Sequence, residues 1–206
     1  MSEQPLTDRA TDEQLLARIG ARDADALSLL FRRRQPDVYR IAMLMTGSSA
    51  AAEDVTQDVF LAVMKDASHF EPGRASVTAW LCGIARNHAR RRLERDRLLQ
   101  PLPDEPEPGR LDAADQADPL HEMSSAEQIE MLRRAILTLP VRYREVVVLC
   151  DLQELSYADA AVALECSIGT VRSRLHRGRA LLTAKMHAQA ETPAVAAAKK
   201  ISRCLA

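Results

Sequence analysis

Aromatic side chains make up only 3% of this chain of 206 residues, while alanine and leucine are common. That balance favours helices over a β-sandwich. No apolar run approaches the length that crosses a membrane. The N-terminal segment MSEQPLTDRATDEQ also lacks the apolar centre of a secretory signal. These absences predict a cytoplasmic protein that does not insert into a membrane.

The chain also lacks the residue patterns that mark enzymes and metal sites. It holds no phosphate-binding loop and no nucleophile–base set. The cysteines at positions 82, 150, 166 and 204 show no Cys-x-x-Cys spacing and no neighbouring pair of histidines. We interpret them as free thiols buried in a reducing compartment, with a metal or redox site as the less favoured alternative. The sequence therefore predicts no enzymatic activity, no cofactor, no metal and no small-molecule substrate.

Charged residues are sorted into blocks, although the formal net charge is only -1. Residues 86–97 and residues 172–185 are strongly basic. Residues 104–130 include nine acidic side chains, and Arg110 is the one arginine or lysine among them. Blocks of opposite sign usually meet different partners, so the distribution of charge, rather than its sum, points to nucleic acid.

The periodicity of apolar residues predicts an all-α protein of two small helical domains joined by an acidic, proline-rich linker. We place the first domain at residues 1–98, the linker at 99–123, the second domain at 124–187 and a tail at 188–206. The linker has five prolines and few large apolar residues, so it cannot bury enough surface to offset its ordering entropy. Pro36 should kink or break a helix that ends near Gly47. Ser76 and Ser124 are the expected caps of later helices.

Residues 156–182, SYADAAVALECSIGTVRSRLHRGRALL, predict a short helix, a tight turn and a second helix rich in arginine. Ser156 caps the first helix, and Asp159 faces its exposed amides. The second helix carries an apolar seam at helical spacing: Val171, Leu175, Gly178 and Leu182. No acidic residue occurs between Glu165 and Glu191. This pattern indicates a helix-turn-helix whose second helix meets DNA, and a merely solvated basic face is the weaker alternative.

A helix expected near residues 50–67 has two contrasting faces. Val55, Val59 and Val63 share one face and should pack inward. The other face carries Asp54, Gln57, Asp58 and Leu61. On a lone helix such a stripe is usually a solvated surface. The alternative is a docking surface for a basic partner protein, because carboxylate and amide oxygens accept hydrogen bonds from arginine.

Two segments together carry a family resemblance. AEDVTQDVFLAV, followed by a loop and TAWLCGIARNHARRRLER, resembles region two of the bacterial sigma-70 family of RNA polymerase sigma factors. LPVRYREVVVLCDLQELSYADAAVALECSIGTVRSRLHRGRALL resembles region four of that family. The two regions cover about residues 12–186 in the family's order, which is typical of its extracytoplasmic-function (ECF) group. Either motif alone would be suggestive, and both together are highly specific.

The resemblance implies an initiation factor for a stress or envelope response, with core RNA polymerase, promoter DNA and an anti-sigma protein as partners. It implies that the face with Asp54 and Asp58 docks on the clamp helices of the largest polymerase subunit. It assigns two loop residues, Phe70 and Arg74, to the -10 promoter element, where the loop captures a flipped base. It assigns to the same element these residues of the following helix: Arg86, Asn87, Arg90, Arg91 and Arg95. It assigns these to the -35 element: Thr170, Arg172, Ser173, Arg174, Arg177 and Arg179.

Some features are left open by the resemblance. Trp80 matches a family tryptophan, although a core anchor is its more ordinary role. Glu165 stands where the family usually has glycine, which predicts a changed turn or mild strain. The linker, by resemblance, threads toward the polymerase active-site channel, where its acidity mimics nucleic acid. The competing class is a dimeric helix-turn-helix repressor or activator. It leaves the acidic stripe unexplained and lacks a clear dimerisation heptad.

Overall fold

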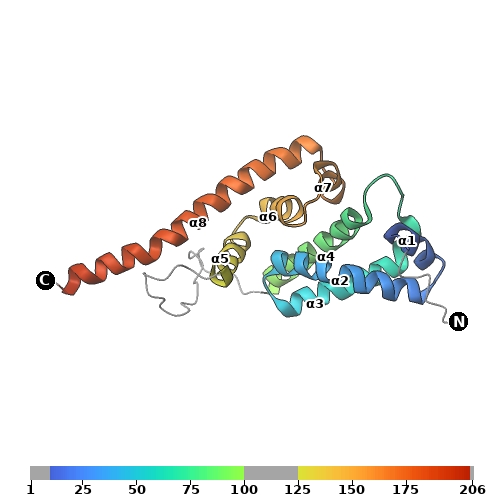
Figure 1. Ribbon diagram of the computed structural model, residues 1–206, viewed down its shortest axis with the longest axis horizontal. Helices are drawn as coiled ribbons and strands as arrows, with labels where there is room; N and C mark the ends of the chain where they lie inside the picture. Colours follow the sequence, from blue (N-terminus) through green and yellow to red (C-terminus); the bar gives the residue numbers. More distant parts are fainter. Residues whose placement is uncertain (1–9, 100–124, 205–206) are drawn as a thin grey trace.

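The computed structural model describes residues 10–99 and 125–204, with side chains placed for residues 10–98 and 126–186. Every regular element in these ranges is a helix, as the sequence predicts, and the helices form two groups that lie side by side (Figure 1). The predicted linker from residue 100 onward and the predicted cap at Ser124 lie outside the described residues. The all-α prediction is therefore confirmed for the part of the chain that the structure describes.

The first group packs four helices around one apolar core: α1 (Asp12–Gly20), α2 (Ala24–Thr46), α3 (Ser49–Asp66) and α4 (Val77–Leu99). α2, α3 and α4 all contact one another, and α1 lies against α2 and a 3-10 turn at Ala67–His69. Leu16, Leu30 and Val59, from three different helices, are almost completely buried in this core. Burial of one face of each helix is the main stabilising contribution, because single helices of this length are marginal in water.

α2 continues through Pro36 without interruption, so the prediction of a break there is wrong. Proline removes one backbone donor, but Val38 and Ile41 are each 1% exposed and hold the following turn in the core. The helix ends at Gly47, as predicted, where φ is 76°. Glycine adopts this left-handed conformation without a steric penalty. Ser48 then caps α3 and accepts a hydrogen bond from the amide of Ala51.

The second group contains α5 (Ser125–Leu137), α6 (Val141–Val147), α7 (Tyr157–Ala163) and α8 (Ile168–Cys204), with a π-helical turn at Val148–Leu152 after α6. α7 and α8 form the predicted helix-turn-helix. The predicted apolar seam of α8 is confirmed, with Val171 and Leu175 buried against α6 and α7. The backbone of α8 stays helical through residues 188–204, so the predicted tail continues this helix up to Cys204.

The turn between α7 and α8 is a Schellman motif closed by a non-glycine residue. The amide of Cys166 donates to the carbonyl of Ala161 at 3.0 Å, and the amide of Glu165 donates to that of Val162 at 3.1 Å. This pair of bonds requires a left-handed residue between them, and Glu165 has φ of 53°. The turn therefore keeps the usual geometry. Of the two outcomes predicted for Glu165, a changed turn or mild backbone strain, the structure shows the strain.

The two groups of helices are packed against each other through α4 with α7 and through α2 with α5. The buried guanidinium of Arg144, on α6, donates to the carbonyls of Met45 and Leu137 and, at 3.1 Å, to that of Leu139. Met45 and Leu137 lie in the last turns of α2 and α5, where carbonyls lack helical partners and carry partial negative charge. Arg144 thus joins a helix end of each group. Burial lowers its pKa, but a guanidinium remains charged near neutral pH.

Candidate protein-docking and nucleic-acid interfaces

The predicted acidic stripe lies on the outer face of α3, opposite the buried valines. Asp54, Gln57 and Leu61 are exposed and Asp58 is partly exposed. Asp54 forms an ion pair with Arg92 of α4 at 2.6 Å, and the imidazole of His88 lies 3.4 Å from the carboxylate of Asp58. Both carboxylates remain about half exposed, with side-chain exposures of 61% and 46%. Side chains of α4 therefore orient both carboxylates, which are still accessible to a partner.

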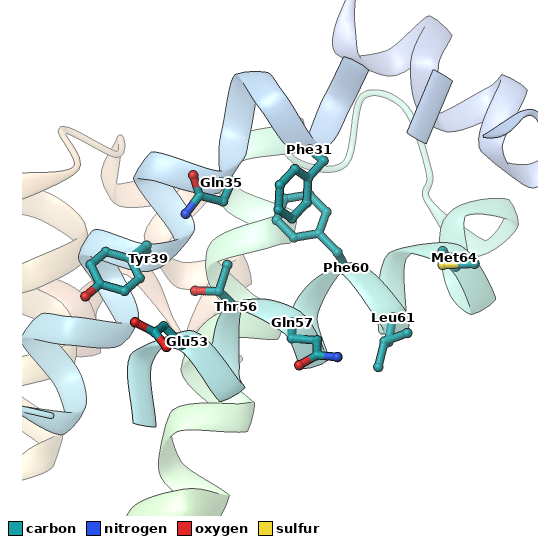
Figure 2. A pocket seen from close by; sticks show the side chains of 9 residues that line it. All are labelled: Phe31, Gln35, Tyr39, Glu53, Thr56, Gln57, Phe60, Leu61 and Met64. Carbon is teal, nitrogen blue, oxygen red and sulfur yellow. The ribbon is translucent and has the colours of Figure 1, made fainter. Parts of the chain in front are cut away.

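An apolar groove of about 430 Å³ lies between α2 and α3 and borders this stripe (Figure 2). Its floor includes Phe31 and Phe60, whose ring centroids are 4.7 Å apart. Leu61 and Met64 extend along α3 at one end, and both are exposed. The groove is also lined by Gln35, Tyr39, Glu53, Thr56 and Gln57. Sequence reasoning missed Phe31 and Met64, because the groove joins two helices and neither residue breaks the apolar pattern of its own helix.

The loop between α3 and α4 holds the aromatic residue predicted to meet a flipped base. Phe70 packs edge-on against Trp80, with ring centroids 5.6 Å apart. Both rings are partly buried against the core of the first helix group, so Trp80 has the anchoring position that the sequence suggested. Arg74 is exposed at the loop and pairs with Glu71 at 3.1 Å. Ser76 caps α4 as predicted, since its hydroxyl accepts from the amide of Ala79.

The basic residues predicted on α4 have very different environments. Arg91 and Arg95 are exposed, as is Arg90 at 44%. Arg86, in contrast, has a side chain only 9% exposed and donates at 2.9 Å to Glu145 of α6, which is 2% exposed. Arg86 also donates to the side-chain oxygen of Asn87. The structure therefore separates Arg86 and Asn87 from the solvent-facing arginines of the same helix.

A cleft of about 490 Å³ lies between the two helix groups and collects several of these charges. Arg86 and Arg90 line it from α4, and Arg174 lines it from α8. Glu145 and Glu165 supply the acidic side chains, and the remaining lining residues are Pro140, Val141, Arg142, Leu164 and Cys166. Residues assigned to two different promoter elements thus face one cleft in this arrangement.

On α8 the burial pattern identifies the surface that points away from the protein. Val171, Leu175 and Gly178 are buried, and a Cβ at Gly178 would lie 2.8 Å from a methyl carbon of Val147. The opposite side of the helix carries Ser173, His176 and Arg177, all exposed. His176 was missed as a candidate, although the helical spacing of the buried seam could have placed it beside Ser173.

Most of the residues predicted on α8, the exposed Ser173 and Arg177 included, also have contacts within the protein. Arg179 forms two hydrogen bonds with Asp151, at 2.5 and 3.0 Å. The guanidinium of Arg172 lies 5.8 Å from the centre of the Tyr157 ring. Arg177 hydrogen-bonds Tyr143 and so lowers the pKa of its hydroxyl group. The hydroxyl of Thr170 lies 2.9 Å from that of Ser167, which caps α8. Ser173 donates to the carbonyl of Thr170.

The cysteines within the described side chains are free thiols. Burial raises the pKa of Cys82 to about 12 and the pKa of Cys150 to about 11. These two thiols are therefore protonated and unreactive near neutral pH. Across residues 10–98 and 126–186 no three histidine, cysteine, aspartate or glutamate side chains are grouped to hold a metal ion. None of the described helices is both long and apolar enough to cross a bilayer.

Comparisons with known proteins match both helix groups. The model of the family Sigma-70 region 2 matches residues 30–98, and that of Sigma-70, region 4 matches residues 129–182. The ECF RNA polymerase sigma factor SigM of Mycobacterium tuberculosis is 36% identical over 172 residues, covering 84% of this chain and 83% of that protein. The ECF RNA polymerase sigma factor SigE of Mycolicibacterium smegmatis is 35% identical over 153 residues, covering 73% of this chain and 57% of that protein.

A solved structure shares the arrangement of the helices. It is the co-crystal structure of the sigma factor RpoE in complex with the anti-sigma factor NepR from Bartonella quintana. The similarity has a TM-score of 0.59 at 25% sequence identity, and it covers 76% of this chain and 94% of that chain.

Proposed function

Because the chain belongs to the sigma-70 family of RNA polymerase sigma factors, in its ECF group, we propose that it binds core RNA polymerase and directs it to a promoter with two separate elements. The observation that carries this proposal is the outer face of α3. An exposed acidic stripe borders an apolar groove there. The same chain also has a helix-turn-helix whose second helix, α8, carries exposed arginines. The reaction chemistry belongs to the polymerase, and this chain supplies recognition and promoter opening.

The docking surface of α3 suits a basic amphipathic partner. Asp54 and Asp58 accept hydrogen bonds from arginine, and the adjoining groove takes apolar side chains around Leu61 and Met64. Exposed apolar area framed by polar groups is the usual composition of a protein interface. We therefore extend the predicted polymerase surface from the stripe into the groove.

Promoter contacts are proposed for α4 and α8. The exposed arginines of α4 hold phosphates, and Asn87 reads a base edge once Arg86 is released from Glu145. The loop with Phe70 and Arg74 meets the melted strand. On α8, Thr170, Arg172, Ser173, Arg174, Arg177 and Arg179 remain the proposed contacts for the upstream element.

His176 is added to this set, because it lies between Ser173 and Arg177 on the exposed side of α8. An imidazole donates to the acceptor atoms of a purine in the major groove. His176→Ala is expected to relax base preference at one position of the upstream element. Binding competition with all four bases at each position measures this, and a uniform loss at every position would assign His176 to phosphate instead.

We further propose that the protein works in the bacterial cytoplasm, in a stress or envelope response, under an anti-sigma protein. The related factor solved in complex with the anti-sigma factor NepR supports such a partner. A dimeric repressor is the less favoured alternative, because it would leave the α3 surface without a role.

Transcription with purified core polymerase tests the proposed function. The full chain should give promoter-dependent transcripts, and Asp54→Arg with Asp58→Arg should weaken core binding at least tenfold, since two acceptors become repelling charges. Asp66→Arg is the matched control, because Asp66 lies on the same helix, outside the stripe and groove, and is 57% exposed. Absence of transcripts, or an equal effect of both changes, would contradict the proposal.

A further inference from the structure

The cleft of about 490 Å³ between the two helix groups has more basic than acidic side chains in its lining. Its charged residues are four arginines and two glutamates: Arg86, Arg90, Arg142, Arg174, Glu145 and Glu165. Two of the arginines come from α4, one from α6 and one from α8, so both helix groups contribute. Four positive and two negative groups leave a net charge of +2 in a recess of the size that small ligands occupy.

Only one of these arginines is fully engaged by an acidic side chain. Arg86 donates to Glu145 at 2.9 Å, and both side chains are buried, so this pair is closed to a ligand. Arg90 lies 3.7 Å from the same carboxylate oxygen and 3.8 Å from a carboxylate oxygen of Glu94. Both distances exceed that of a hydrogen bond, so the donors of Arg90 remain available to an acceptor in the cleft.

The other two arginines have no acidic partner. Arg174, on α8, is half-buried in the cleft and forms no hydrogen bond or ion pair with any residue that the structure describes. A guanidinium that loses part of its hydration without gaining an acceptor is open to an anion. Arg142, at the beginning of α6, lies 4.7 Å from the centre of the Tyr143 ring. No carboxylate within residues 10–98 and 126–186 lies at ion-pair distance from it.

We propose that this cleft binds a small anion with two linked phosphate groups, held by Arg90 of the first helix group and by Arg142 and Arg174 of the second. The planar fork of a guanidinium pairs with two phosphate oxygens at once. Three such forks match the six terminal oxygens of pyrophosphate better than the four oxygens of a single phosphate. This binding is separate from polymerase docking and from promoter recognition.

The remaining residues of the cleft limit what the anion carries and how tightly it binds. The uncharged part of the lining consists of Pro140, Val141, Leu164 and Cys166. None of these is aromatic, so a nucleobase has no ring there on which to stack, and recognition falls on the phosphates. The carboxylate of Glu165, in the strained turn before α8, repels the anion and so lowers the affinity.

Isothermal titration calorimetry of the full chain with sodium pyrophosphate, without magnesium and at fixed ionic strength, tests the proposal. One pyrophosphate should bind per chain with a Kd below about 1 mM, and inorganic phosphate should bind at least about tenfold more weakly. ADP carries the same two phosphates on a nucleoside and distinguishes the two sources of this chemistry. Tighter binding of ADP assigns the site to a nucleotide, and equal or weaker binding assigns it to free pyrophosphate.

Substitutions locate the site. Arg90→Gln and Arg174→Gln, one in each helix group, should each weaken pyrophosphate binding about tenfold, because each removes a charge-assisted pair of hydrogen bonds. Glu165→Gln should strengthen binding several-fold, because it removes the repelling charge and keeps the shape of the side chain. Arg97→Gln is the matched control, since Arg97 is exposed on α4 and lies outside the cleft. It makes the same change in net charge and should leave the affinity as it is.

The opposite directions expected for Arg174→Gln and Glu165→Gln separate a binding site from damage to the fold, and circular dichroism of each variant checks its helix content. Lack of saturable binding below about 10 mM would overturn the proposal. An equal loss for Arg97→Gln and Arg174→Gln would also overturn it, because binding would then follow net charge alone. Transcription with core polymerase is a separate measurement, so failure of the proposed function and failure of this site are distinguishable.

Discussion

Replacing Glu165 by glycine should stabilise the protein, although it removes a charged side chain from the turn between α7 and α8. Glu165 has φ of 53°, and the Schellman hydrogen bonds on either side hold it there. A non-glycine residue in this conformation costs about 1–2 kcal/mol. Glycine gives back about 0.4–1 kcal/mol through its greater freedom in the unfolded chain. The expected net gain is therefore about 0.5–1 kcal/mol in the free energy of unfolding.

Urea and thermal unfolding followed by circular dichroism measure this gain. The midpoint should rise by roughly 2 °C for a chain of this size. Glu165→Ala is the matched control, because alanine removes the carboxylate and keeps the strained backbone. Comparison of the two variants separates the backbone effect from any change in charge in the cleft with Arg174. If Glu165→Gly were no more stable than Glu165→Ala, the strain argument would be refuted.

Two substitutions test the packing, and one labelling experiment tests the thiols. Gly178→Ala should lower stability by about 1 kcal/mol in urea unfolding, since overpacking against Val147 exceeds the gain in helix propensity. Arg144→Met should cost about 3 kcal/mol, because buried carbonyls at two helix ends lose a charged donor, and calorimetry should show the loss. N-ethylmaleimide at neutral pH should label Cys166 well before Cys82, whose labelling should need strongly alkaline pH because its thiolate forms only near pH 12. Equal rates for the two thiols would contradict that assignment.

Patterns that lie within one helix could be predicted well from the sequence. The buried seam at Val171 and Leu175 and the outward stripe at Asp54 follow from the helical period alone, and both are confirmed as placed. Ser76 and Ser156 cap the helices assigned to them, because an N-cap depends on residues three positions away. The roles of the stripe and of the basic helices in binding remain predictions.

Features that depend on two distant segments could not be predicted. Arg86 and Glu145 are 59 positions apart, and each belongs to an unremarkable helical pattern. Nothing local distinguishes Arg86 from Arg91, which is exposed on the same helix. The groove at Phe31 was missed for the same reason, since it exists only where α2 meets α3. Tertiary packing decides which member of a repeated pattern is buried, and sequence periodicity carries no information about the partner helix.

The hydrogen bonds from Ser76 to Asp159 have a consequence for local motion. They hold the beginning of α4, and with it the end of the loop that carries Phe70 and Arg74, from across the boundary between the helix groups. When the groups separate, the amide of Ser76 loses Asp159 as its acceptor and hydrogen-bonds to water instead. The end of the loop is then no longer held in place. Hydrogen–deuterium exchange at that amide would then report the separation directly. The segment proposed to receive an extruded base would gain its freedom in the same event that uncovers Arg86.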